Sequence, residues 1–171
     1  MGEVVISHDA PLKPELTFWE FLDLYRQYGD GLPLALNIKA DGLAKNVKSA
    51  LEKMSIKNYF VFDMSAPDHR YYINEKVNSF TRESDFETIP VFYRDSQGVW
   101  LDEFDSHWLS QEVFIKHLKN NKSIAIVSPE LHGRSYQKEW LEYRECIRTL
   151  NESGNIYLCT DFPSIAKEFF E

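Results

Sequence analysis

The sequence predicts an α/β protein built around parallel β-strands, and two patterns along the chain support this. Short runs rich in β-branched and aromatic residues alternate with stretches that have the apolar period of a helix. Most of the short runs are continuously apolar, which is typical of strands covered by helices on both faces. Two architectures fit, an open doubly wound sheet and part of a (β/α) barrel, and both place polar residues at the carboxyl ends of their strands.

Seven short segments are predicted strands: residues 4–7, which we expect to form an N-terminal ribbon, and residues 34–39, 59–64, 78–82, 98–102, 123–128 and 156–160. No glycine-rich phosphate loop follows any of them, so the nucleotide-binding form of the fold is not favoured. The sequence shows no repeat, no low-complexity segment and no linker, and residues 1–171 are therefore predicted to form a single domain.

Helices are predicted in the intervals between these strands. Thr17 and Glu20 form a capping-box pattern, in which the hydroxyl binds an amide of the first turn and the carboxylate reaches back. The helix that they open is expected to run to about Tyr28 and to stop at Gly29. Further helices are predicted over residues 43–54, about 106–120, about 135–151, and 163–170, the last opened by a proline at a favoured first position.

Composition and charge exclude several classes of protein. With 43% apolar and 15% aromatic residues, a chain of 171 residues can bury the core of one domain. The net charge of −8 leaves no basic stripe of the kind that nucleic-acid-binding domains carry. The apolar stretches fall short of the roughly 20 residues that span a bilayer, and no signal peptide is visible. Two cysteines are too few for a disulfide framework, so a reduced, cytoplasmic protein is expected.

Ionisable side chains collect at the ends of the predicted strands. A group of this kind suits phosphate-ester chemistry, because cations balance phosphoryl oxygens, a histidine moves a proton and carboxylates hold a divalent metal. The strand-end residues are His8, Asp9, Asn37, Lys39, Asp63, Arg82, Asp102, Glu103, Glu130, His132 and Asp161. Since the strands are expected to be parallel, one shared mouth is predicted for His8, Lys39, Arg82, Glu130 and Asp161.

Some of these residues have an equally good structural explanation. Asp9 and Asp161 fit turns or helix caps, and Arg82 fits a solvated ion pair with its neighbour. Residues 130–134 place three ionisable groups in one strand-to-helix loop, which fits a helix entry as well as a site.

The remaining histidines carry less signal. His107 and His117 are predicted to be surface residues of one helix, and His69 is placed in a polar loop. Tyr71 and Tyr72 fit either the core or a ligand platform.

Four short segments follow one another along the chain in an order that is typical of a known family. They are residues 2–9 (GEVVISHD), 16–22 (LTFWEFL), 36–39 (LNIK) and 159–163 (CTDFP). This order resembles the later part of the domain of the glycerophosphodiester phosphodiesterase family, within the phosphatidylinositol-phospholipase-C-like TIM barrels. The resemblance implies an incomplete (β/α) barrel of about six parallel strands plus the N-terminal ribbon. Residues 35–43, 59–67 and 127–134 are similar to a bacterial subgroup associated with surface-polysaccharide gene sets.

The resemblance also implies roles for particular residues. His8 would be the general acid for the leaving alcohol and Lys39 a phosphate contact, while Asn37 stands where the family has a metal-binding Glu. The family's His-Arg-Gly strand and Glu-x-Asp strand have no counterpart in this chain. A divalent metal, Mg²⁺ or Ca²⁺, is implied without the charged ligands that would hold it. The candidate substrate-binding residues are Asn37, Asp63, Arg82, Trp100, Glu130 and Asp161.

Three functions are open at this point. The first is metal-assisted hydrolysis of glycerophosphodiesters or sugar-phosphate diesters, and the second is non-catalytic binding of a phosphorylated sugar or a partner on the same scaffold. The third is an unrelated flavodoxin-like binding domain. Since the missing strands would leave open sheet edges, a homo-oligomer that closes the barrel is predicted as a partner, next to a small-molecule phosphodiester or phosphosugar.

Overall fold

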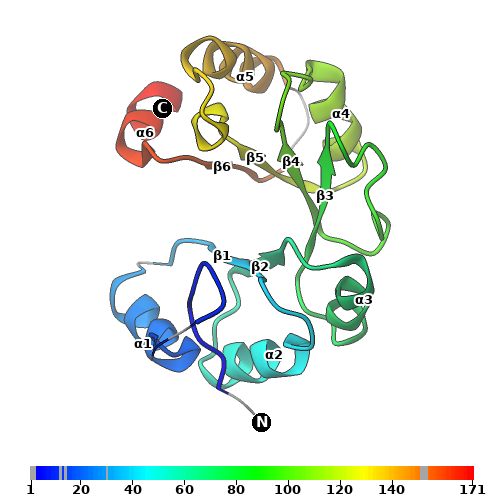
Figure 1. Ribbon diagram of the computed structural model, residues 1–171. Coiled ribbons are helices and arrows are strands. Elements are labelled where there is room, and N and C mark those ends of the chain that lie inside the picture. Colours follow the sequence, from blue (N-terminus) through cyan, green and yellow to red (C-terminus); the bar gives the residue numbers. More distant parts are fainter. Residues whose placement is uncertain (1–2, 12, 14, 30, 151–153) are drawn as a thin grey trace. The chain divides into compact units, whose positions relative to one another are not determined.

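A computed structural model of the chain describes residues 3–11, 13, 15–29, 31–150 and 154–171. The predicted α/β class is confirmed, because the described strands form two parallel sheets and, except between β3 and β4, helices separate them along the chain (Figure 1). The elements are α1 (Phe18–Tyr28), β1 (Leu34–Asn37), α2 (Ala44–Lys53), β2 (Tyr59–Phe62), α3 (Ala66–Asn74), β3 (Phe80–Ser84), β4 (Gly98–Asp102), α4 (Gln111–Lys119), β5 (Ser123–Val127), the 3₁₀ helix η1 (Pro129–His132), α5 (Gln137–Thr149), β6 (Ile156–Cys159) and α6 (Pro163–Phe170).

The chain forms two compact units, Met1–Ser79 (unit 1) and Phe80–Glu171 (unit 2). Unit 1 contains the parallel pair β1–β2, and unit 2 contains a parallel sheet of strand order β3-β4-β5-β6. That residues 1–171 act as one domain stays a prediction. In the described part of the chain, no helix combines the length and the apolar character needed to cross a membrane.

In unit 1, the capping box that opens α1 is confirmed. Thr17 Oγ1 accepts from the backbone N–H of Glu20 at 3.2 Å, and a carboxylate oxygen of Glu20 accepts from the Thr17 N–H at 2.9 Å. The helix ends at the predicted cap, Gly29. The N-terminal ribbon is only partly formed, because residues 4–7 form no strand and Val5 makes an isolated antiparallel bridge to Thr17.

The core of unit 1 forms where helices cover one face of β1 and β2. Along β1 and just after it, Leu34, Leu36 and Ile38 are buried against this core, while Ala35 and Asn37 are exposed. Successive side chains of a strand point to opposite faces, so the residues that alternate with the core residues are free to line a site.

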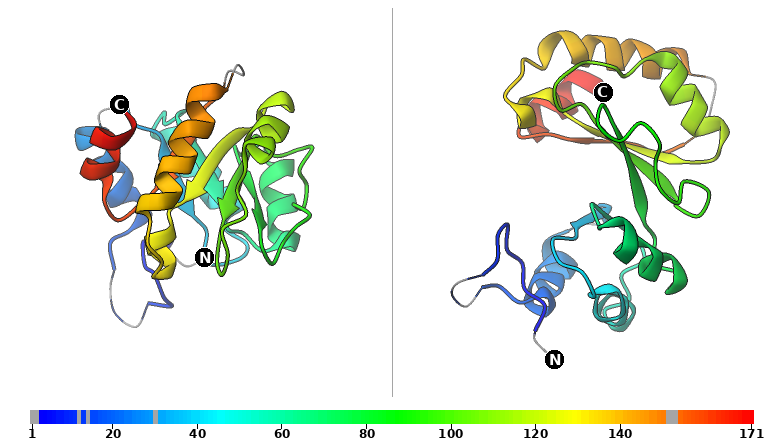
Figure 2. Two further views of the ribbon diagram at one scale, coloured as in Figure 1. Left: turned by 90° about the horizontal axis from the view of Figure 1, so that it is seen from above. Right: turned by 45° about the vertical axis from the view of Figure 1, so that its right-hand side comes forward.

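In unit 2, helices α4, α5 and α6 cover one face of the four-stranded sheet (Figure 2). Val99 and Leu101 of β4 and Ile124 and Ile126 of β5 pack with the helices in one buried cluster. Trp100 and Asp102 alternate with these residues and therefore belong to the opposite face of the sheet.

Two elements escaped prediction. Helix α3 is one of them, and Ser65 is its N-cap, with a hydroxyl that accepts from the Asp68 N–H at 3.3 Å. Its polar sequence, with Pro67 at the second position, suggested a loop. Because these residues form a helix, the prediction that His69 lies in a loop is wrong. His69 lies in α3, is buried, and its Nε2 is 3.0 Å from Ser79 Oγ. The other element is η1, within the loop after β5.

Two further expectations are corrected. His117 is fully buried rather than a surface residue, because its Nδ1 is 3.0 Å from the Tyr93 hydroxyl and its Nε2 is 3.3 Å from Glu83. His107 lies before α4 rather than on it. The helix begins only at Gln111, since the backbone N–H groups of Trp108 and Leu109 are bound by a side chain from the end of β4.

Candidate functional site

A pocket of about 490 Å³ lies in unit 1, beside the carboxyl end of β1. It lies within the size range of small-molecule sites, which is about 300–1,000 Å³. Three of the predicted site residues line it: His8, Asn37 and Lys39. The structure therefore brings together, within one unit, residues from the N-terminal segment and from β1 that sequence reasoning had grouped only by their positions at strand ends.

His8 is open to solvent in this pocket. Its side chain is 88% exposed, and Nδ1 lies 3.1 Å from a carboxylate oxygen of Asp9, which also lines the pocket. An ion pair this exposed contributes little to folding, so His8 is not held in place as a structural residue. A histidine with this access can exchange protons with solvent and with a bound molecule.

Lys39 and Asp63 form the charged part of this site. Lys39 Nζ lies 3.3 Å from Asp63 Oδ2, which joins the residues that follow β1 and β2. Asp63 has a φ of 69°, a left-handed conformation that is uncommon outside glycine. Backbone conformations of this kind persist where surrounding contacts enforce them, and they cluster at functional sites. The pocket residues His8, Asn37 and Lys39, with Asp63 bound to Lys39, therefore form one group of predicted site residues in unit 1.

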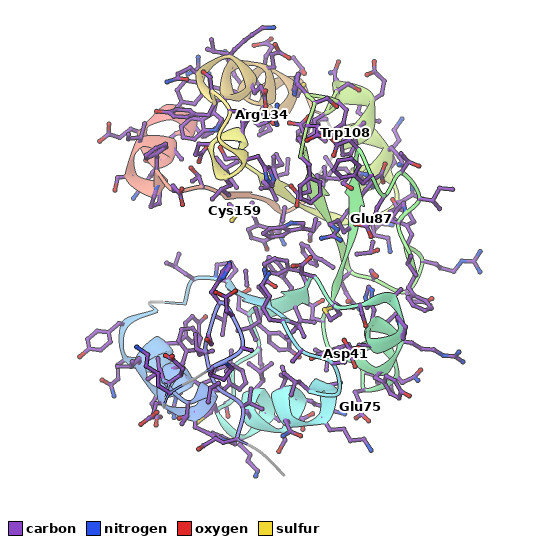
Figure 3. All side chains as sticks on the ribbon, viewed as in Figure 1. Asp41, Glu75, Glu87, Trp108, Arg134 and Cys159 are labelled. Atoms are coloured by element: carbon purple, nitrogen blue, oxygen red, sulfur yellow. The ribbon has the colours of Figure 1, made fainter. Side chains whose placement is uncertain are left out.

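In unit 2, a second group of polar residues follows the strands. Arg82 of β3 pairs with Glu87 (labelled in Figure 3), and the Arg82 guanidinium lies 5.8 Å from the ring centre of Phe104. The same ring is 4.8 Å from the ring of His132. Phe104 therefore connects an arginine from the first strand of this sheet with a histidine from η1.

His132 also makes a short contact with Asp102 at the end of β4. Its Nε2 lies 2.6 Å from Asp102 Oδ1, and only 8% of the Asp102 side chain is exposed. Burial raises the pKa of Asp102, while the bond to His132, the charges of His132 and Arg82 and a hydrogen bond from Trp100 oppose this rise. Trp100, a predicted site residue, is thereby placed next to Asp102.

Glu130 connects η1 to the turn after β6. Its carboxylate accepts hydrogen bonds from the hydroxyls of Ser128 and Thr160, and it accepts from the backbone N–H of Asp161 at 3.2 Å. Both carboxylate oxygens therefore already have partners within the chain. The predicted substrate-binding roles of Glu130 and Asp161 stay predictions.

A third cluster in unit 2 contains the residue types of a metal site. Possible ligand atoms of Glu103, His107 and Glu139 all lie within 4.8 Å of one another. Glu103 is fully buried, and its Oε1 accepts from the N–H groups of Trp108 and Leu109 at 2.6 Å and 2.8 Å (Figure 3 labels Trp108).

The donors around this cluster do not suit a bound cation. The remaining Glu103 oxygen accepts from the hydroxyl of Tyr143, and Arg134 pairs with Glu139 at 2.8 Å. Burial lowers the pKa of His107, but the bond to Glu142 and the charges of Glu103 and Glu139 raise it by more. Protein hydrogen-bond donors and the positive charge of Arg134 therefore already satisfy these carboxylates.

Sequence reasoning missed the pairing of Asp102 with His132. Both residues were recognised as strand-end residues, but they are 30 positions apart and belong to different elements. The signal that could have found them is their common place after neighbouring parallel strands, β4 and β5, whose carboxyl ends lie side by side. The predicted shared mouth of His8, Lys39, Arg82, Glu130 and Asp161 stays a prediction.

The fold and these residues define an α/β protein with ionisable groups at the carboxyl ends of parallel strands. Among solved structures, the chain is similar to a putative glycerophosphodiester phosphodiesterase from Galdieria sulphuraria, with a TM-score of 0.71 and 14% sequence identity. The match covers 91% of this chain and 64% of that protein. No family model and no curated protein sequence matches the chain.

This likeness supports the fold predicted from sequence. The parallel strands alternating with helices, and the similarity over most of the chain to a protein of a TIM-barrel family, agree with an incomplete (β/α) barrel. The chain spans less than two thirds of the length of the protein that it matches. Because fold does not determine function, the activity has to be argued from the residues of the pocket.

Proposed function

We propose that this chain is a phosphoric diester hydrolase of the glycerophosphodiester phosphodiesterase class, which acts on small glycerophosphodiesters or sugar-phosphate diesters. The observation that carries the proposal is the pocket of unit 1, where His8, Asn37 and Lys39 line about 490 Å³. The sequence resemblance and the likeness in fold support the same class.

The side chains of this pocket supply two of the functions that diester hydrolysis needs. A phosphodiester is an anion at neutral pH, so a cation must offset the charge that builds up on the phosphoryl oxygens, and Lys39 carries such a charge. His8 would protonate the oxygen of the leaving alcohol, because histidine is a common general acid in reactions near neutral pH. Asn37 would donate its amide N–H to a hydroxyl or a phosphoryl oxygen of the substrate.

A divalent metal, Mg²⁺ or Ca²⁺, is implied by the resemblance and would add further positive charge at the phosphate. Among the described residues, the one group of three candidate ligands is Glu103, His107 and Glu139, and protein donors already satisfy it. The pocket of unit 1 offers the amide of Asn37 where the family has a glutamate. The side chains present therefore do not fit a tightly held metal, and metal dependence is a matter for assay.

The poor fit of the described pocket residues to a metal favours a second candidate function. The described residues of this pocket form no group of three candidate metal ligands, but its lysine and histidine would still bind a phosphorylated sugar. We therefore propose non-catalytic phosphosugar binding as the alternative. It predicts affinity for glycerol phosphate or a sugar phosphate without turnover of any diester.

The cellular setting belongs to the proposal as well. We propose a cytoplasmic protein of bacterial lipid or surface-polysaccharide metabolism, with a small phosphodiester or phosphosugar as ligand. The acidic net charge of −8 supports the absence of nucleic acid among its partners.

The experiment measures turnover of bis-p-nitrophenyl phosphate and of glycerophosphodiesters, with EDTA or with Mg²⁺, Ca²⁺ or Mn²⁺. Wild-type protein is compared with His8→Ala and with Lys57→Ala, a substitution at an exposed lysine outside the pocket. The hydrolase proposal expects turnover that His8→Ala lowers about 10²–10⁴-fold and Lys57→Ala leaves unchanged. Turnover that His8→Ala does not affect would end the proposed role of His8, and binding without turnover would favour the alternative.

A further inference from the structure

A second pocket, of about 410 Å³, lies in unit 2, and we call it the α5–α6 pocket. Side chains of these two helices line it together with side chains of β5 and β6. Its volume is within the range of small-molecule sites. Its described lining residues all belong to unit 2, and none of them takes part in the proposed hydrolysis, so this pocket needs an explanation of its own.

The apolar lining of this pocket is the outer edge of the core of unit 2. Ile147, Ile156 and Leu158 pack against the buried core cluster but are themselves only half-buried. Ile156 and Leu158 alternate along β6 and therefore share one face of the strand. Phe170, the last residue of α6, is also half-buried and lines the pocket. A hydrocarbon chain bound here would remove the remaining apolar surface of these side chains from water.

Three cationic side chains line the same pocket: Arg144 and Arg148 from α5, and Lys167 from α6. Neither Asp nor Glu is among the described lining residues, although the whole chain has 27 acidic side chains against 19 Lys and Arg. Arg144 and Arg148 are four residues apart on one helix, where like charges repel each other. An anion bound in the pocket would offset this repulsion.

These cations can be reached by a ligand. Arg144 is oriented by Phe169, whose ring centre lies 4.2 Å from the guanidinium and whose carbonyl oxygen accepts from Nη1 at 3.3 Å. A guanidinium has five N–H donors, so one such bond leaves others for an anion. Arg148 is exposed. Lys167 pairs with Glu171 at 3.8 Å, but both side chains are at least 70% exposed, and such a pair competes weakly with a bound anion.

We propose that the α5–α6 pocket binds a single-chain anionic amphiphile, of the class of fatty acids and alkyl phosphates. The alkyl chain lies against Ile147, Ile156 and Leu158, and the carboxylate or phosphate lies among the three cationic side chains. Arginine suits either head group, because its planar fork of donors matches carboxylate and phosphate oxygens. The ligand differs in kind from the small phosphate ester proposed for unit 1, and the inference does not depend on hydrolysis.

The first test measures binding to the whole chain by isothermal titration calorimetry, with each probe below its critical micelle concentration. We expect dodecanoate and dodecyl phosphate to bind, and the tighter of the two identifies the preferred head group. Dodecyltrimethylammonium has the same chain with a positive head group and should bind about 10-fold or more weakly. From octanoate to dodecanoate, the affinity should rise about tenfold for every two methylene groups, because each is buried.

A double variant tests the cationic side chains. Arg148→Gln combined with Lys167→Gln should raise the Kd for the tighter anionic probe about 10–100-fold. The matched control is Arg94→Gln combined with Lys119→Gln, which changes the net charge equally at two exposed residues of unit 2 outside the pocket. The control should keep the wild-type Kd.

Methyl ¹H–¹³C NMR spectra locate the bound chain. Dodecanoate should shift the methyl signals of Ile147, Ile156 and Leu158, and glycerol 3-phosphate, which lacks the chain, should not. Equal affinity for anionic and cationic probes, wild-type affinity in a folded Arg148→Gln/Lys167→Gln protein, or binding that leaves these methyl signals unshifted overturns the proposal. Absence of binding overturns it as well, and an oligomer in light scattering would then identify a second copy of the chain as the occupant.

Discussion

Lys39 Nζ lies 3.3 Å from a carboxylate oxygen of Asp63, and the two residues follow the neighbouring parallel strands β1 and β2. The pairing holds a cation at the carboxyl end of the strands while leaving nearly half of the Lys39 side chain exposed to the pocket. Asp63 reaches this position through its left-handed backbone directly after β2. A phosphate that enters the pocket would therefore meet a lysine that is already oriented.

Removing this charge should weaken binding of a phosphate ester. We expect Lys39→Ala to raise the Kd for glycerol 3-phosphate about 10–100-fold, because a charge-assisted hydrogen bond contributes roughly 1.5–3 kcal/mol. Lys57→Ala, at an exposed lysine, should leave the Kd unchanged. Isothermal titration calorimetry measures both. Equal affinities of wild-type protein and Lys39→Ala would remove Lys39 from the site.

His69 should make the fold less stable in acid. Burial lowers the pKa of His69 to about 4, whereas an unfolded chain has its ordinary value of about 6.5. Between these values the unfolded state binds the proton and the folded state does not, so stability falls as the pH decreases from about 6.5 to about 4. The full loss is about 3 kcal/mol at about 1.4 kcal/mol per pKa unit.

Urea unfolding at several pH values measures this loss. In His69→Gln, the free energy of unfolding should depend less on pH over this range, by about the same 3 kcal/mol. A variant with the wild-type pH dependence would show that His69 is not the titrating group.

His107 should change the pH dependence of stability in the direction opposite to His69, because it stabilises the fold at low pH. Its pKa is raised in the folded protein, because the bond to Glu142 and the charges of Glu103 and Glu139 outweigh burial. The stabilisation is fully present below the unfolded value of about 6.5 and is lost as the pH rises through the folded pKa. We therefore expect His107→Gln to lower Tm clearly at about pH 6 and much less in alkaline solution. Thermal melts at the two pH values test this, and a Tm decrease that does not vary with pH would contradict it.

Self-association is expected from the edge of the sheet in unit 2. β6 pairs with β5 on one side, and the described residues provide no strand on its other side. Its residues are half-buried or exposed, including Ile156 and Leu158. Since an unpaired edge recruits another strand, we predict a dimer or larger oligomer at micromolar concentration. Light scattering during size-exclusion chromatography checks this prediction, and the mass of a monomer would refute it.

Much of the fold could be predicted from local pattern. The strands of the structure match six of the predicted ones within two residues at each end, because continuous apolar runs between helices leave few alternatives. The strand predicted to begin at residue 78 begins at Phe80 instead, and α3 was missed because its polar residues give a weak helical period.

The candidate site was predictable where it depends on sequence order and not where it depends on tertiary pairing. Asn37 and Lys39 are two residues apart at the end of one strand, so a shared face follows from the alternation of β1. The pairing of Asp102 with His132 needs β4, β5 and η1 in place. The burial of His117 likewise depends on Tyr93 and Glu83, from other parts of unit 2, and not on its own helix.

The central claim is that the pocket of unit 1 binds a phosphate ester, and a crystal soaked with glycerol 3-phosphate tests it most directly. We predict phosphate density within hydrogen-bond distance of Lys39 Nζ, with the His8 ring beside the ester oxygen. A phosphate group bound elsewhere on the molecule, with this pocket filled only by water, would contradict it.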